Sequence, residues 1–108
     1  MEDVKNFETE VLEQSKKQPV LVDFWATWCA PCRMLGPVIE EAAQEANGTW
    51  TLAKVNTETM PEIAMKYGVR SIPNVKLFVN GEVVDEFVGA IPKAAINDFM
   101  DKALKVHA

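Results

Sequence analysis

The stretch VDFWATWCAPCRMLGP (residues 22–37) holds both cysteines of the chain and two of its three tryptophans. It overlaps the segment PVLVDFWAT, which is apolar on both faces and is typical of a central strand covered by helices. A helical pattern starts near the cysteines and runs to Ala46, where Asn47 and Gly48 form a typical helix end. The stretch therefore predicts a buried strand that passes directly into a helix, with Asp23 inside the strand and two cysteines at the junction.

Helical and strand patterns alternate on both sides of this stretch. Asn6 is a suitable N-cap for a first helix, and Asn80–Gly81 lie between two alternating runs, as in a β-hairpin with a type I′ turn. The further segments are, in order, a strand at 49–56, a short helix at 60–68, a hairpin at 74–89 and a helix at 92–106. The resulting order α, β, α, β, α, β, β, α predicts an α/β fold, with a central mixed sheet of four to five strands flanked by four helices.

Length and charge limit the possible functions. With 108 residues the chain is long enough for its own core, so we expect a single domain over residues 1–108. The formal net charge of −5 argues against nucleic acid or an anionic membrane as the main partner. No apolar run reaches the roughly 18–20 residues that span a bilayer, and the N-terminal MEDVKNFETE lacks the apolar core of a secretory signal. This pattern fits a cytoplasmic protein, although a mature form whose signal has been removed would look the same.

Three interpretations are open for a Cys-x-x-Cys pair. A closed zinc site needs about four ligands, whereas this chain offers two cysteines and one histidine, His107, so we expect no metal. A structural disulfide across two intervening residues would constrain the unfolded chain very little. The third interpretation is a dithiol that cycles between a reduced and an oxidised form.

The position of the pair favours the cycling dithiol. A helix that begins around Cys29 directs unpaired backbone N–H groups and the positive end of its dipole at that sulfur, which favours thiolate over thiol. Pro31 lacks an N–H and has a fixed φ, so it suits the first turn of this helix. Cys32 follows one turn further on and should be the more buried of the two. The pair is therefore interpreted as a redox group rather than as a structural crosslink.

Five fragments of the chain, taken in order, closely resemble the thioredoxin family. They are VDFWAT, WCAPC, SIP at 71–73, NG at 80–81 and VGA at 88–90. Each fragment alone is weak, but together they cover nearly the whole chain with the expected spacing. The resemblance implies the thioredoxin fold and thiol–disulfide exchange, in which the electrons reside in the two sulfurs and no cofactor is bound.

The resemblance implies roles for four residues at the centre of the site. Cys29 matches the nucleophilic cysteine, which attacks a target disulfide, and Cys32 matches the resolving cysteine, which attacks Cys29 and releases the reduced target. Asp23 matches the buried acid behind the pair, and Lys54 matches its neighbour on the adjacent strand. Burial of an unpaired carboxyl would raise the pKa of Asp23, so that it can accept the Cys32 proton through a water. The alternative is a structural acid that is hydrogen-bonded or paired with Lys54.

The resemblance also implies a target-binding groove around the disulfide. Pro73 matches the family's cis-proline, and backbone groups just before it pair with an extended target peptide by strand addition. The expected groove residues are Trp28, Ala30, Pro31, Ile72, Pro73, Val88, Gly89 and Ala90. Without the resemblance, Trp28 is interpreted as a surface aromatic, and Ile72 and Val88 as ordinary core.

Several positions depart from the family's usual pattern. Ala30 stands where most thioredoxins have glycine, and Asn74 follows the cis-proline in place of the usual threonine. Thr57 replaces a residue that is often apolar, and Ile91 takes the place of a capping serine. The short segment before Asn6 leaves open whether a first edge strand forms. These changes bear on the redox potential and on partner preference, and they leave the reaction class intact.

Together these observations predict a small cytoplasmic protein disulfide reductase. Its expected partners are disulfide-containing target proteins and a separate thioredoxin reductase, NADPH-dependent if the usual family arrangement holds, and we expect a monomer. One alternative with the same chemistry is a disulfide oxidase or isomerase of an oxidising compartment, which differs in the potential of the pair. Another is a non-catalytic module that binds a partner at the groove.

Overall fold

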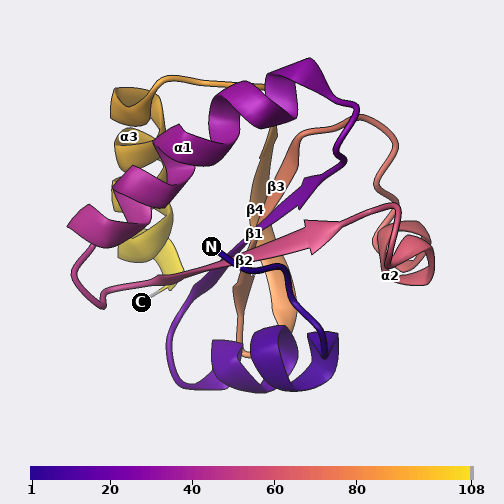
Figure 1. Cartoon of the computed structure of the whole chain (residues 1–108). Coiled ribbons are helices and arrows are strands. Elements are labelled where there is room, and N and C mark those ends of the chain that lie inside the picture. Colours follow the sequence, from indigo (N-terminus) through magenta and orange to yellow (C-terminus); the bar gives the residue numbers. More distant parts are fainter. Residues whose placement is uncertain (108) are drawn as a thin grey trace.

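The apolar segment after Pro19 forms β1 (Val20–Trp25), an inner strand of a four-stranded sheet with the order β2-β1-β3-β4. A computed structural model describes residues 1–107 of the chain (Figure 1). β1 pairs in parallel with β2 (Thr51–Asn56) and antiparallel with β3 (Asn74–Val79), which in turn pairs antiparallel with β4 (Glu82–Val88). The mixed sheet that the order of elements predicted is therefore confirmed.

The predicted helices form close to their expected bounds. α1 (Ala30–Glu45) follows β1, α2 (Pro61–Lys66) follows β2, and α3 (Lys93–His107) follows the hairpin. The first helical region departs from the usual winding, because π-helical turns at η1 (Glu8–Glu13) continue as a 3-10 turn at η2 (Gln14–Lys16). Figure 1 shows α1 and α3 on one side of the sheet and η1 and α2 away from them. Within residues 1–107, no helix combines the length and the apolar character needed to cross a bilayer.

The structure contains two local features that the sequence predicted, a capping bond from Asn6 and a turn at Asn80–Gly81. The Asn6 Oδ1 atom accepts a hydrogen bond from the Thr9 amide at 3.1 Å, which satisfies one of the free donors at the start of η1. At the hairpin, Asn80 and Gly81 have φ values of 53° and 81°. A type I′ turn needs positive φ at both central residues, which explains why this asparagine–glycine pair closes the hairpin.

The N-terminal segment does not extend the sheet by a full strand. Asp3 forms one isolated parallel bridge with Lys54, and the Val4 amide donates to the Lys54 carbonyl at 2.8 Å. Of the four to five strands expected, four form within the described part of the chain.

The core is divided by the sheet into two layers, and the alternation along β1 decides which side chains face each layer. Leu21 packs in the layer beneath α1 and α3, whereas Val22 and Phe24 pack in the layer on the side of η1. Because successive strand residues point to opposite faces, Asp23 shares the face of Leu21. The acid therefore lies beneath α1, the helix that begins at the cysteines, and its exposed fraction is 0%.

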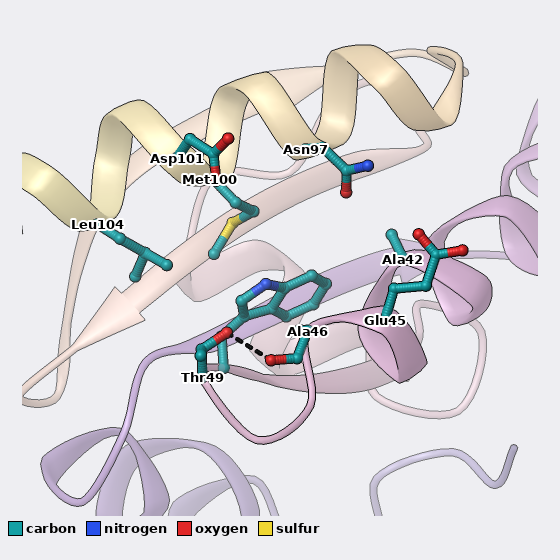
Figure 2. Close-up of a pocket in the computed structure, with 9 residues that line it drawn as sticks. Ala42, Glu45, Ala46, Thr49, Asn97, Met100, Asp101 and Leu104 are labelled. Carbon is teal, nitrogen blue, oxygen red and sulfur yellow. Dashed lines mark hydrogen bonds between the residues drawn. The ribbon is translucent and has the colours of Figure 1, made fainter.

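A cavity of about 340 Å³ lies between the C-terminal end of α1 and α3 (Figure 2). Trp50, Met100 and Leu104 contribute to its lining, and the Thr49 Oγ1 atom donates to the Ala46 carbonyl at 2.8 Å at its edge. Neither cysteine lines this cavity, so it is separate from the redox pair.

Candidate redox site

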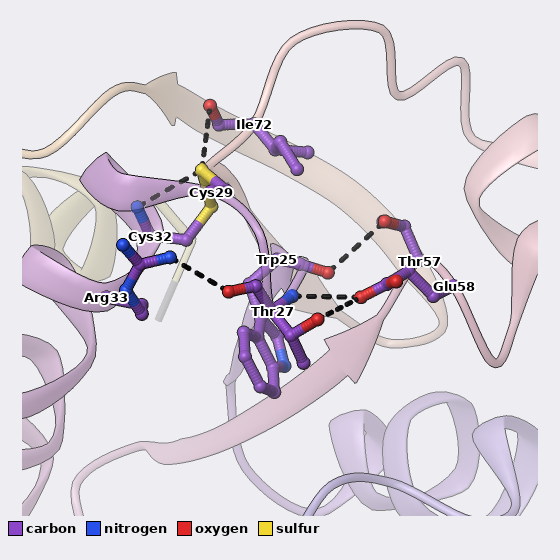
Figure 3. Close-up of a disulfide and its surroundings, with 8 residues drawn as sticks. All are labelled: Trp25, Thr27, Cys29, Cys32, Arg33, Thr57, Glu58 and Ile72. Carbon is purple, nitrogen blue, oxygen red and sulfur yellow. Dashed lines mark hydrogen bonds between the residues drawn. A yellow bond between two sulfur atoms is a disulfide. The ribbon is translucent and has the colours of Figure 1, made fainter.

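Cys29 and Cys32 form a disulfide at the N-terminus of α1 (Figure 3). Cys29 is the N-cap residue, and its Sγ atom accepts a hydrogen bond from the Cys32 backbone N–H at 3.2 Å. Both residues are buried, with exposed fractions of 4% for Cys29 and 2% for Cys32. Amide donors and the helix dipole stabilise negative charge at a cap position, so this geometry favours a thiolate at Cys29 in the reduced protein.

The Ile72 carbonyl oxygen lies 3.8 Å from the Cys29 Sγ atom, as Figure 3 shows. The Ile72–Pro73 peptide bond is cis, in agreement with the expectation for Pro73. The Pro73 carbonyl in turn accepts a hydrogen bond from the Gly89 amide at 2.9 Å. The loop before β3 and the end of β4 are thus held together beside the disulfide.

Asp23 is a buried carboxyl on the inner strand β1. Within residues 1–107, neither Oδ1 nor Oδ2 is hydrogen-bonded. Burial raises the pKa of Asp23 from its ordinary value of 3.8 to about 7. The Lys54 ammonium opposes this increase, and the carboxylates of Glu40 and Asp3 add to it. Asp23 therefore changes its protonation near neutral pH, where thiol–disulfide exchange takes place.

Lys54 stands directly across from Asp23 in the register of β1 and β2. Its Nζ atom nevertheless forms its ion pair with Glu40 of α1, at 3.3 Å from Oε2, and lies 4.9 Å from the centroid of the Trp25 ring. No ion pair within the described residues joins Lys54 to Asp23. Within the described residues, Asp23 therefore has neither a protein hydrogen bond nor an ion pair, and Trp25 lies against the Lys54 ammonium.

The predicted groove residues differ widely in exposure. Trp28 and Val88 are exposed large side chains, at 69% and 53%, and Ala30, Pro31 and Ala90 are also exposed. Ile72 and Gly89 are half-buried, and Pro73 is buried. The Ile72 carbonyl thus places one backbone acceptor of this surface beside the Cys29 sulfur.

The loop that leads from β1 to Cys29 is held by residues that the sequence analysis did not identify. One Glu58 oxygen accepts from the Thr27 amide at 2.9 Å and from the Thr27 hydroxyl at 2.8 Å, which lowers the pKa of Glu58. Arg33 donates from Nη1 to the Thr27 carbonyl at 2.9 Å, and the Thr57 hydroxyl donates to the Trp25 carbonyl at 3.2 Å (Figure 3). In the sequence, Glu58 is notable only as the neighbour of Thr57. That position does not reveal its contact with Thr27, which is 31 residues away.

Within the described residues, no three His, Cys, Asp or Glu side chains gather closely enough to hold a metal ion. The groups that can exchange electrons at this site are the two sulfurs, and Asp23, on the sheet face beneath α1, can exchange a proton near neutral pH. A cysteine pair that caps a helix in this way carries two electrons between its dithiol and disulfide forms. The chain falls in the class of thiol–disulfide oxidoreductases.

Comparison with known proteins identifies the family. The model of the family described as Thioredoxin matches residues 1–102. A thioredoxin of Chlorobaculum thiosulfatiphilum is 51% identical over 98 residues, which cover 91% of this chain and 89% of the relative. Thioredoxin 1 of Synechococcus elongatus is 50% identical over 98 residues (91% and 90%), and chloroplastic thioredoxin M5 of Oryza sativa is 49% identical over 100 residues (93% and 57%).

The chain belongs to the thioredoxin family. It is a thioredoxin-type disulfide reductase, and its redox-active group is the Cys29–Cys32 disulfide. Membership of the family implies two kinds of partner, target proteins that contain disulfides and a reductase that returns electrons to the pair.

Proposed function

We propose that Cys29 attacks the target disulfide and that Cys32 resolves the mixed disulfide. The observation that carries this assignment is the hydrogen bond from the Cys32 amide to the Cys29 sulfur at the start of α1. It supports Cys29 as the thiolate, since amide donors lower the pKa of a thiol that caps a helix. Cys32 lies inside the first turn, in position to attack the Cys29 sulfur and close the disulfide.

In the first step the Cys29 thiolate forms a bond to one sulfur of the target disulfide, and the other target sulfur leaves as a thiolate. Cys32 then loses its proton to Asp23 through a water, and its sulfur attacks the Sγ atom of Cys29. The bond between Cys29 and the target breaks, and the second target sulfur leaves as a thiolate. Two electrons have then passed to the target, and its two thiolates take up one proton from Asp23 and one from solvent.

Asp23 acts as the general base in this proposal. Its carboxyl is buried beneath α1, and no hydrogen bond from residues 1–107 reaches it. Its pKa of about 7 suits a group that must accept a proton at neutral pH and release it afterwards. Lys54, across the strand pair, supplies a nearby positive charge when Asp23 ionises.

Target peptides bind along the surface formed by Trp28, Ala30, Pro31, Ile72, Pro73, Val88, Gly89 and Ala90. Two features support this surface as the groove. Trp28 and Val88 are exposed apolar side chains, and the half-buried Ile72 has its carbonyl beside the Cys29 sulfur. An extended peptide that pairs with the backbone before Pro73 would bring its own disulfide to Cys29.

The electrons come from a thioredoxin reductase that draws on NADPH, and the protein works as a monomer. A protein that donates electrons to disulfides must itself be kept reduced, which requires a reducing compartment such as the cytoplasm. A titration of the dithiol against a glutathione buffer tests this assignment. A potential near that of the family's reductases is expected, whereas a potential more than about 100 mV higher would favour an oxidase or isomerase.

Trapping experiments test the two cysteine roles. Cys32→Ser should still attack a target such as insulin, but should accumulate the mixed disulfide, because the resolving sulfur is missing. Cys29→Ser should form no such adduct, and iodoacetamide near neutral pH should label Cys29 of the reduced wild type first. Mass spectrometry of the adducts and alkylated peptides reads both results. Preferential alkylation of Cys32, or adducts from Cys29→Ser alone, would reverse the assignment.

A further inference from the structure

Lys54 lies near two acidic residues, Asp23 and Glu40, but forms an ion pair with Glu40 alone among the described residues. Its Cα atom is the register partner of Asp23, and both residues lie on the sheet face beneath α1. The Nζ atom is nevertheless 3.3 Å from the Oε2 atom of Glu40, while both Asp23 oxygens lack a hydrogen bond within residues 1–107. The buried acid thus has a lysine beside it on the sheet, and that lysine is bonded to a different carboxylate.

Gly36 leaves the space in which this ion pair forms. It lies one turn before Glu40 on α1, so the two residues share one side of the helix. A Cβ atom at Gly36 would lie 3.4 Å from the Lys54 Nζ atom and 3.9 Å from the Glu40 Oε2 atom. The ammonium group therefore rests closely against the helix backbone, at the place where Glu40 receives it.

The Trp25 ring and the N-terminal segment also contact the Lys54–Glu40 pair. The Met1 ammonium lies 3.6 Å from the Oε1 atom of Glu40, the oxygen that Lys54 does not use. The Lys54 Nζ atom lies 4.9 Å from the centroid of the Trp25 ring, and the Trp25 indole N–H donates to Asp3 at 2.8 Å. The Val4 amide donates to the Lys54 carbonyl. A cation held over an aromatic face and bonded to a carboxylate has little freedom to move, so these contacts fix the ammonium at Glu40.

We propose that Glu40 is a positioning residue that draws the Lys54 ammonium away from Asp23, so that the Asp23 carboxyl stays unpaired beneath α1. This inference rests on the proposed role of Asp23 as the base. The charged groups around Asp23 are Lys54 from β2, Glu40 from α1 and Asp3 from the N-terminal segment, and the sulfur of Cys32 lies at the start of α1. Of these groups, only Lys54 favours the ionised carboxylate.

Glu40 then has two effects on Asp23, one direct and one through Lys54. Its negative charge opposes ionisation of Asp23 directly, and its bond to Lys54 keeps the opposing positive charge away. In Glu40→Gln the direct repulsion is lost and Lys54 is free to pair with Asp23. Both changes lower the pKa of Asp23, which makes it a weaker base for Cys32.

The experiment is a carboxyl ¹³C NMR titration of Asp23 in the oxidised protein, in which neither cysteine titrates. We expect Glu40→Gln to lower the Asp23 pKa by about half a pH unit or more, the size expected for one nearby charge. Glu41→Gln is the matched control, because Glu41 is the next residue of α1 and bonds to Lys93 rather than to Lys54. Glu41→Gln should leave the Asp23 pKa unchanged. Glu40→Asp, which keeps the negative charge, should have an Asp23 pKa close to that of the wild type.

A double-mutant cycle with Lys54→Met separates the two effects of Glu40. If Glu40 acts through Lys54, the decrease caused by Glu40→Gln should be clearly smaller in the Lys54→Met background than in the wild type. An equal decrease in both backgrounds would mean that Glu40 acts only by direct repulsion, and it would overturn the proposal. No decrease in either background would also overturn it.

A kinetic measurement distinguishes failure of this inference from failure of the proposed base. The rate at which the mixed disulfide is resolved should follow the Asp23 titration, so its pH profile should move to lower pH in Glu40→Gln and not in Glu41→Gln. If Asp23→Asn leaves the resolution rate unchanged, the base role fails, although the NMR cycle still decides whether Glu40 positions Lys54. If the cycle fails while Asp23→Asn slows resolution, Asp23 remains the base and the inference about Glu40 is wrong.

Discussion

Each face of the sheet carries a strand lysine across from an acidic residue. The lysine and the acid form an ion pair on one face but not on the other. On the side of η1 and α2, the buried Lys76 lies 2.9 Å from Glu86 across β3 and β4, and the Asn74 side-chain amide donates to the same oxygen at 2.9 Å. These donors lower the pKa of Glu86. On the side of α1, Lys54 is bonded to Glu40, and the pKa of Asp23 is raised to about 7.

The difference shows that neighbouring positions on adjacent strands do not by themselves make an ion pair. Glu86 lies on the edge strand β4 with its side chain half exposed, so water and two donors solvate the carboxylate. Asp23 lies on the inner strand β1 with no exposed surface, and its neighbouring lysine is bonded elsewhere. Glu86 and Lys76 thus form a structural ion pair that stays ionised. Asp23 instead has a raised pKa and can gain or lose a proton near neutral pH.

The largest expected effect comes from removing the unpaired acid. Because folding raises the pKa of Asp23, the folded state binds more protons than the unfolded state between pH 3.8 and about 7. The free energy of unfolding of the oxidised protein should therefore fall as pH rises through this window. From pH 5 to pH 8 the loss should be about 3 kcal/mol, and Asp23→Asn should remove it. Urea unfolding at several pH values measures both curves.

Asp23→Asn should also slow the resolution of the mixed disulfide, by up to about 100-fold at neutral pH, because the proposed general base is lost. The variant should be at least as stable as the wild type at pH 8, since the cost of a buried carboxylate is absent. If the stability of both proteins changed with pH in the same way, folding would not raise the pKa of Asp23 above its ordinary value. Unchanged resolution with a clear loss of stability would favour a purely structural acid.

A smaller effect is expected from breaking the ion pair on the other face. Glu86→Gln leaves the Lys76 ammonium buried without an anion, and we expect a loss of about 1–2 kcal/mol in the free energy of unfolding, reduced by the exposure of Glu86 to water. Lys76→Met is the matched variant, because it removes the buried charge and keeps an apolar stem of similar length. It should cost less than Glu86→Gln, or nothing.

Thermal or urea unfolding ranks these two variants, and insulin reduction should proceed near the wild-type rate in both. If Lys76→Met proved the more damaging, the pair would be contributing net stability beyond the cost of burying its charges. The contrast between the two faces would then lie in the strength of pairing as well as in its presence.

The sequence predicted what depends on local pattern. The strand–cysteine–helix junction and the Asn80–Gly81 hairpin follow from periodicity and turn chemistry, which act over a few residues. The π-helical winding of η1 was not predicted, because its apolar spacing fits an ordinary helix equally well. The reduction of the first edge strand to one bridge at Asp3 was left open, since a short segment pairs or not according to its neighbours.

Within the site, the sequence placed the cysteines and the buried acid but not the groups that decide how the acid behaves. Glu40 and Lys54 are 14 residues apart, and Glu58 and Thr27 are 31 apart. Whether such side chains meet depends on the rotation of α1 over the sheet and on the path of a loop. Neither quantity leaves a periodic signal. The choice of Glu40 over Asp23 as the partner of Lys54 could be read only from the folded chain.

The smallest effect is expected at Ala30, the departure from the family pattern closest to the sulfurs. Ala30 is the exposed first residue of α1 and contributes to neither the Lys54–Glu40 nor the Lys76–Glu86 ion pair. It therefore tests whether an uncharged residue between the cysteines affects their redox potential. Ala30→Gly should cost up to about 1 kcal/mol of stability through lost helix propensity. The loss should fall on both redox forms, because α1 starts at the pair in each. Even a loss confined to one form corresponds to about 20 mV for a two-electron couple, so we expect a shift below that value against a common glutathione buffer. A shift beyond about 50 mV exceeds what helix propensity can supply, and would mean that residue 30 sets the potential independently of the charges around Asp23.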